Sequence, residues 1–114
     1  VLVSQGYAKC SIVPVNKKSI VTSDKGIRDA WERSGGKALL IRPGHVKLPG
    51  YKSGFIGGAT GVTERSIFFV GRLDFHPDAQ AMRDFINKAG KNIIELHDGP
   101  LYDVGGVNLF EACL

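Results

Sequence analysis

Long apolar runs are absent from this chain of 114 residues. The longest uninterrupted ones, such as residues 67–70, have four or five residues, whereas a helix that spans a bilayer needs roughly 20. The sequence also contains no charged and apolar leader with a cleavage site. We therefore predict no membrane partner and no secretion signal. Because the chain begins at Val1 rather than Met, a leader that precedes it stays an open alternative.

Cysteine is scarce as well. The two cysteines, Cys10 and Cys113, lie near opposite ends of the chain and lack the close spacing of metal ligands. This usage favours a reduced, cytoplasmic environment, with a single long-range disulfide as the alternative. We predict no metal ion and no other cofactor.

Clusters of basic residues are missing although the net charge is +4. Lys17 and Lys18 form the only adjacent basic pair, and they fall in a predicted turn. Nucleic-acid binders usually carry a basic stripe, often with stacking aromatics. We therefore predict no nucleic-acid partner and a small molecule as the candidate ligand, and the oligomeric state is left open.

The first half of the chain has the pattern of two strands, a helix and a third strand. Residues 7–15 and the β-branched segment 19–22 predict a hairpin with a polar turn between them. Ser23 and Asp24 are typical of a helix start, and Gly35–Gly36 of a helix end. The apolar run 38–41 predicts a strand that is buried on both faces. Residues 45–47 predict a short edge strand.

The second half repeats this pattern. The glycine-rich residues 54–63 predict an extended segment, and residues 66–70 predict a strand. Pro77 suits the first position of a helix. Apolar residues at helical spacing follow it, and Gly90 ends the helix. Residues 92–96 predict the returning strand.

The two halves align with each other at nearly constant offsets. Ser19–Ile20 matches Ser66–Ile67 at an offset of 47 residues, and Gly6–Tyr7 matches Gly54–Phe55 at 48. Lys37 matches Lys91, and a further echo of the glycine stretch begins at Tyr102. A period of this length is typical of propellers and arrays. We predict one partial domain with units at 6–53 and 54–100 and the start of a third at 101–114; chance similarity between two α/β halves is the alternative.

A ββαβ unit that opens on Gly-Gly resembles the repeat of the pentein propeller, the fold of the guanidine-modifying enzymes (GME). The sequence is still more similar to an uncharacterised GME-fold domain family of unknown function. Five segments carry this resemblance, namely residues 6–10, 20–24, 48–58, 76–78 and 101–105. It implies an α/β fold, a partial pentein-like propeller with two complete units and a truncated third.

The resemblance also implies a function that the sequence only partly supports. Pentein enzymes act on guanidino compounds with a cysteine nucleophile, a histidine acid/base and carboxylates in a central channel. Their Gly-Gly is commonly followed by Asp, which holds the guanidinium, but this position is Ala59 here. Their nucleophile lies in the last unit, which this chain lacks. Residues 107–114 match nothing in the family, so Cys113 inherits no role from it. Shared fold alone does not transfer the activity.

Cys10 is the candidate nucleophile, because it aligns with Gly58 at the opening of a unit. A catalytic thiol needs a neighbour that lowers its pKa. Lys9 is adjacent but points to the opposite face of a strand. Burial as a small apolar residue is the favoured alternative for Cys10.

Asp74, His76 and Asp78 alternate in a way that fits a divalent metal or acid/base chemistry. Residues 76–78 equally fit a helix N-terminus, and capping is the favoured interpretation. His76 is the first choice for a functional imidazole, because a capping histidine can still titrate. His45 and His97 lie beside turns and are interpreted as solvated.

The glycine stretch 54–61 has two interpretations, a phosphate-binding loop and close packing of backbones. A phosphate loop needs a helix directly after it, whereas a strand follows here, so close packing is favoured. Asp103 fits a channel carboxylate and a turn-capping residue equally well.

Two functional hypotheses follow. In the first, the chain is an enzyme-like or substrate-binding domain with Cys10 as nucleophile, His76 as acid/base, and Asp78 and Asp103 as channel carboxylates. In the second, it is a non-catalytic binding or structural module in which the same residues pack and cap. Whether the chain is an enzyme is left open.

Overall fold

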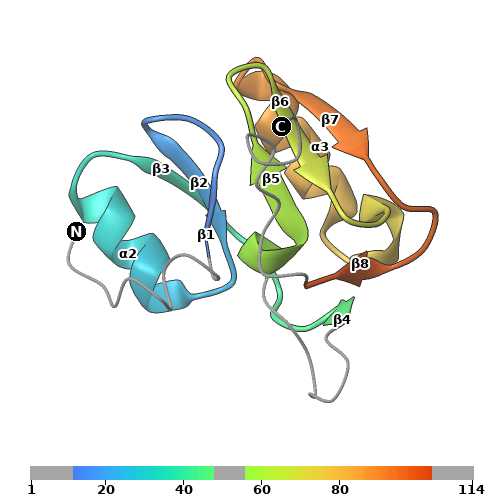
Figure 1. The fold of residues 1–114 in the computed structure, drawn as a ribbon. Coiled ribbons are helices and arrows are strands. Elements are labelled where there is room, and N and C mark those ends of the chain that lie inside the picture. Colours follow the sequence, from blue (N-terminus) through green and yellow to red (C-terminus); the bar gives the residue numbers. More distant parts are fainter. Residues whose placement is uncertain (1–11, 48–55, 104–114) are drawn as a thin grey trace.

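The structure is a computed structural model that describes residues 12–47 and 56–103 (Figure 1). The first part holds a three-stranded sheet of β1 (Ile12–Pro14), β2 (Ser19–Thr22) and β3 (Lys37–Leu40), in that spatial order. β1 runs antiparallel to β2, and β3 runs parallel to it. Helix α2 (Lys25–Arg33) connects β2 with β3, as a parallel pair requires.

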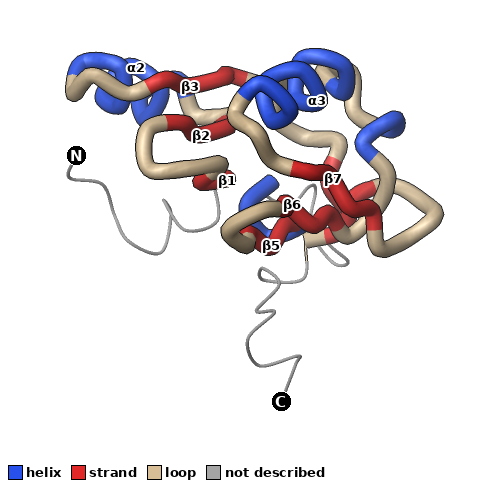
Figure 2. Tube along the Cα trace, turned by 90° about the horizontal axis from the view of Figure 1, so that it is seen from above, coloured by secondary structure: helices blue, strands red, loops and turns tan. Residues whose placement is uncertain are grey.

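The second part has the same arrangement. Its sheet consists of β5 (Thr60–Val62), β6 (Ser66–Phe69) and β7 (Asn92–Glu95), again antiparallel and then parallel. Helix α3 (Ala79–Lys88) connects β6 with β7, and the 3₁₀ turns η1 (Ile56–Ala59) and η2 (Leu73–Phe75) precede β5 and α3. In Figure 2 both long helices lie along the same side of the molecule, and β5 lies on the side away from them.

A third, two-stranded sheet ties the two parts together. β4 (Val46–Lys47) follows the first sheet in sequence and pairs in parallel with β8 (Leu101–Tyr102), which follows the second. The first strands of the two larger sheets, β1 and β5, also contact each other. The mixed α/β class predicted from the sequence is therefore confirmed for the described residues.

Local sequence explains where the helices begin and end. The Asp24 carboxylate accepts a hydrogen bond from the amide of Ile27 at 3.0 Å and caps α2, as predicted. Such a cap stabilises a helix by about 1 kcal/mol. Gly35 and Gly90 follow the two helices with φ of 95° and 82°, a left-handed backbone that glycine adopts without steric cost.

The apolar core contains side chains from both three-stranded sheets. The central strands β2 and β6 are its most buried strands, and α3 covers it with Met82 and Ile86. The fully or almost fully buried side chains of the core are Val13, Val15, Val21, Ile41, Val46, Ile56, Ala59, Ile67, Phe69, Leu73, Met82, Ile86 and Leu101. No helix in the described part of the chain is long and apolar enough to cross a membrane.

Three sequence-based expectations are wrong in detail. The apolar strand β3 is not buried on both faces: its end residues Lys37 and Leu40 are exposed, because β3 lies at the edge of its sheet. Residues Ile56–Ala59 form a 3₁₀ turn rather than an extended segment. Ser19 pairs with Lys37 and Ser66 with Asn92, so the equivalent of Lys37 is Asn92, one position later than Lys91.

Candidate functional site

His76 lies between η2 and α3, and its side chain is 0% exposed. Its Nδ1 is 2.9 Å from the backbone nitrogen of Asp78, and its Nε2 is 3.2 Å from the carbonyl oxygen of Arg42. An amide can only donate and a carbonyl can only accept, so Nδ1 is the acceptor and Nε2 carries the hydrogen. This network assigns His76 as a neutral imidazole with both nitrogens bonded inside the protein.

Burial lowers the pKa of His76 below its ordinary value. The charge of Asp78 and the carbonyl of Arg42 raise this pKa, whereas His45 lowers it further. The His45 ring lies edge-on to the His76 ring, with centroids 5.4 Å apart. His45 adopts φ of 63°, a left-handed conformation that is uncommon outside glycine. No sequence pattern indicates this pair, since His45 follows an ordinary Pro-Gly turn.

Asp78 occupies the N-cap position of α3, but its side chain makes no capping bond. Its carboxylate instead accepts the amide hydrogen of Arg42 at 2.7 Å and lies 3.7 Å from the Arg42 Nε. Capping is therefore not the role of this carboxylate, and Pro77 lies outside the helix rather than at its first position. Asp78 and His76 together attach the segment after β3 to the start of α3.

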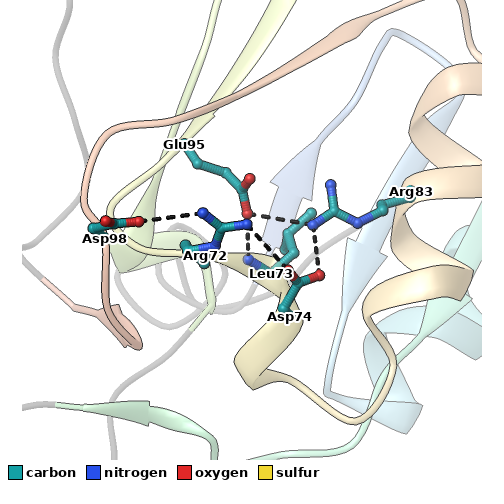
Figure 3. A network of polar contacts seen from close by, with 6 residues as sticks. All are labelled: Arg72, Leu73, Asp74, Arg83, Glu95 and Asp98. Carbon is teal, nitrogen blue, oxygen red and sulfur yellow. Dashed lines mark hydrogen bonds and ion pairs between the residues drawn. The ribbon is translucent and has the colours of Figure 1, made fainter.

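Asp74 does not join His76 and Asp78. It lies in an exposed charged network with Arg72 and Arg83 (Figure 3). Its carboxylate is 2.9 Å from the Arg83 Nη2 and 3.3 Å from the Arg72 Nη2. Hydrogen bonds lower the pKa of Asp74; the bond from Arg83 has the largest effect, and the bond from Arg72 the next largest. The metal interpretation of residues 74, 76 and 78 is wrong, because no group of three or more His, Cys, Asp or Glu in the described residues could hold a metal ion.

The rest of the network connects η2 to the end of β7 (Figure 3). Glu95 accepts the amide hydrogen of Leu73 at 2.6 Å and lies 3.4 Å from the Arg83 Nη2. The Arg72 Nη1 lies 3.2 Å from Asp98, and hydrogen bonds to Asp98 and Asp74 raise the pKa of Arg72. Every charged side chain of the network is thus opposed by another. Sequence reasoning missed these residues, because their pairing depends on tertiary positions.

Asp103 and the glycine stretch lie against each other. The Asp103 amide donates to the carbonyl of Lys47 at 2.8 Å, which continues the β4–β8 pairing. Its carboxylate lies so close to the Cα of Gly58 that any side chain at position 58 would collide with it. Gly57 and Gly58 are buried, and the Gly57 carbonyl accepts a bond from the Thr60 hydroxyl at 3.1 Å. These contacts support close packing over a phosphate loop.

The two cysteines cannot be placed relative to these groups. Cys10, Cys113 and the opening residues Gly54 and Phe55 lie outside the described residues. Of the predicted site, the structure brings His76 and Asp78 together, with Nδ1 and the nearer carboxylate oxygen 3.9 Å apart. Asp103 belongs to a different part of the fold, at the β4–β8 sheet.

Comparison with known proteins identifies a family. The description "Family of unknown function (DUF6873)" matches residues 1–108. This chain belongs to the DUF6873 family. Neither a curated protein nor a solved structure matches it. Membership of DUF6873 covers both sheets and the β4–β8 pairing, and it assigns no activity and no ligand. Nothing in these comparisons links the DUF6873 chain to the pentein enzymes.

Proposed function

We propose that this chain is a pentein-like domain, a partial α/β-propeller of ββαβ units at 6–53 and 54–100 with a third unit starting at residue 101. The identical strand order and directions of the two sheets support this proposal. So does the equivalence of their hydrogen bonds: the amides of Ile41 and Leu96 donate to the last residues of β2 and β6, at 2.9 and 2.8 Å. The contact between β1 and β5 fits a propeller, in which one strand of each unit faces the axis.

We further propose that the domain binds a small molecule without transforming it. The observation that carries this proposal is the state of His76. A general acid or base must present a nitrogen to the substrate. Both nitrogens of His76 are bonded to backbone groups, and the side chain is fully covered. The Asp78 carboxylate accepts the amide hydrogen of Arg42 and is thereby committed to the fold.

Asp103 is the carboxylate that we propose for ligand recognition. The guanidine-modifying enzymes place Asp directly after Gly-Gly, whereas Ala59 is fully buried here. Asp103 directly follows β8 and is half-buried, and its carboxylate lies against Gly58, the residue before Ala59. A carboxylate can accept two parallel hydrogen bonds from a guanidinium. The proposed ligand is therefore a guanidino compound. The alternative is an enzyme with Cys10 as nucleophile and His76 as acid/base.

Thermal melting with agmatine and arginine tests the proposal, with norleucine, an amino acid that lacks the guanidinium, as the control. We expect agmatine to raise the Tm of the wild-type protein and Asp103→Asn to abolish the shift. Incubation with either compound should release no ammonia or urea. Product that forms in the wild type and is lost in both Cys10→Ser and His76→Gln would establish the enzyme alternative. An agmatine shift that persists in Asp103→Asn would exclude Asp103 as the recognition group.

The reactivity of Cys10 gives an independent measure. In a Cys113→Ser background, a non-catalytic Cys10 should react with iodoacetamide at neutral pH no faster than a free thiol. An activated thiolate reacts faster, because its pKa is lowered. A rate well above that of a free thiol would therefore contradict the non-catalytic assignment.

A further inference from the structure

A pocket of about 600 Å³ lies between the β1–β2 turn and the last turn of α3. Four of the residues that line it are lysines: Lys17 and Lys18 in the turn, Lys37 at the start of β3, and Lys88 at the end of α3. We refer to it as the lysine pocket. Its volume lies within the range of small-molecule sites, roughly 300 to 1,000 Å³.

In residues 12–47 and 56–103, no acidic side chain balances the charges of the lysine pocket. No Asp or Glu lines it, and none of the four lysines takes part in an ion pair among the described residues. Lys88 alone has an explanation within the fold, because a cation at the end of a helix is favoured by the helix dipole. The other three cations have none. Like charges that converge on a concave surface raise the local concentration of anions.

The wall between the lysines is apolar. Phe85 of α3 and Ala89, the residue that follows α3, line the pocket, and both also pack against the core. An aromatic ring beside cations suits a ligand that has a planar body as well as negative charge. A free inorganic ion would leave this apolar wall unused.

The β1–β2 turn is held in place before any ligand arrives. The Asn16 side chain accepts the amide hydrogen of Lys18 at 2.9 Å. The Lys18 carbonyl accepts bonds from the Trp31 indole at 3.0 Å and from the Lys37 amide at 2.7 Å. The backbone of Lys18 and Lys37 is therefore fixed by hydrogen bonds, which reduces the entropy lost on binding.

We infer that the lysine pocket binds a small organic anion that carries at least two negative charges on a planar apolar body. Lys17, Lys18, Lys37 and Lys88 contact the charged groups, and Phe85 contacts the body. This site is separate from the carboxylate site at Asp103, and it takes a ligand of opposite charge.

Intrinsic fluorescence measures occupancy directly, because Trp31 is the only tryptophan of the chain and is bonded to the turn that lines the pocket. Three probes distinguish the contribution of the ligand's negative charge from that of its planar body: ATP without magnesium, tripolyphosphate, and adenosine. We expect ATP to bind more tightly than tripolyphosphate, and adenosine to bind least. Binding of ATP should weaken strongly between about 50 and 500 mM salt, because ion pairs at an open pocket are screened.

Charge removal at the pocket provides the decisive variant. Lys17→Gln/Lys88→Gln should weaken ATP binding by roughly tenfold or more, because two charge-assisted contacts are lost. The matched control Lys25→Gln/Lys47→Gln removes the same net charge from α2 and β4, outside the pocket, and should change binding less than about twofold. Phe85→Leu keeps an apolar residue against the core and should bring ATP binding close to that of tripolyphosphate.

Several results would overturn the inference. Absence of ATP binding would do so, as would equal weakening in the two double variants. Equal affinity for ATP and tripolyphosphate would show that a planar body contributes nothing to binding. Tighter binding of a short single-stranded DNA than of ATP, lost in Lys17→Gln/Lys88→Gln, would replace the small ligand by nucleic acid. Circular dichroism on every variant separates lost binding from lost fold.

Discussion

Around Arg72, acidic and basic side chains bond to one another, whereas the lysine pocket brings four cations together without an acid among the residues that line it. The first arrangement also includes a backbone amide, that of Leu73, and connects η2, α3 and the end of β7. The second connects a turn, a strand start and a helix end. Charges that satisfy one another serve the fold, and charges left unbalanced on a concave surface are available to a ligand.

The His76–Asp78 pair is similar to the Arg72 network, and differs from the lysine pocket, because its polar groups are bonded within the protein. Its polar atoms are bonded to the backbone at Arg42 and Asp78. Among the described residues, no buried side-chain nitrogen or oxygen lacks a partner. His76 and Asp78, two of the predicted catalytic residues, are thus bonded within the fold.

Among these predictions, removal of Glu95 from the Arg72 network should cause the largest loss of stability. Glu95→Ala leaves the Leu73 amide without its acceptor and Arg83 without one of its carboxylates. We expect a loss of about 1–3 kcal/mol in the free energy of unfolding, measured by urea denaturation. Glu95→Gln keeps an oxygen for the Leu73 amide and should lose clearly less. Equal losses in the two variants would show that the Leu73 bond contributes little.

Loss of the Asp78 carboxylate comes next. Asp78→Ala removes the acceptor of the Arg42 amide and a partly exposed ion pair. We expect a loss of about 0.5–1.5 kcal/mol in the free energy of unfolding. The nearby exposed Asp84, which accepts a bond from Gln80 on the same helix, is the matched control. If Asp84→Ala destabilised the protein as much as Asp78→Ala, the attachment at Arg42 would carry no special weight.

The pH dependence of stability tests whether His76 is neutral in the folded protein. The pKa of His76 is lower in the folded protein than its ordinary value of about 6.5. The unfolded chain therefore binds more protons as the pH falls, so the contribution of neutral His76 is present above about pH 6.5 and is lost below it. Urea midpoints from pH 8 to 5 should fall more steeply for the wild type than for His76→Gln. His97→Gln should keep the wild-type slope.

Neutralisation of the lysine pocket is the smallest expected effect on stability. Lys17→Gln/Lys88→Gln relieves repulsion and removes no internal bond, so the free energy of unfolding should stay within about 0.5 kcal/mol of the wild type. The corresponding change in the Arg72 network, Asp74→Asn, should lower stability, because Arg72 and Arg83 each lose one of two carboxylate partners. A large loss in the lysine variant would mean that these cations serve the fold.

Local patterns predicted most of the regular structure. The β-branched segment 19–22, the cap at Asp24 and the apolar stripe that buries Met82 and Ile86 all have causes within a few residues. The exposure of Leu40 could not be predicted in this way, because the apolar run is the same whether its strand lies at the centre or the edge of a sheet.

The candidate site depends more heavily on tertiary structure. His76 and Asp78 are two residues apart in the sequence, but their partner Arg42 lies more than 30 residues earlier in the chain. The contact of Asp103 with Gly58 and the lysine pocket likewise join distant segments. Sequence spacing identifies residue types that suit a site, and only the fold shows which of their atoms are already bonded.

The tautomer and charge of His76 show whether its imidazole is bonded within the fold or available for proton transfer. Two-dimensional nitrogen–proton NMR of the imidazole resonances, recorded between pH 5 and 8, distinguishes a bare nitrogen from a protonated one. We expect a neutral ring with hydrogen on Nε2 and a bare Nδ1, and a titration midpoint below that of an exposed histidine. A ring that titrates at about 6.5 or higher, or that carries its hydrogen on Nδ1, would contradict the account and return His76 to the role of an acid/base.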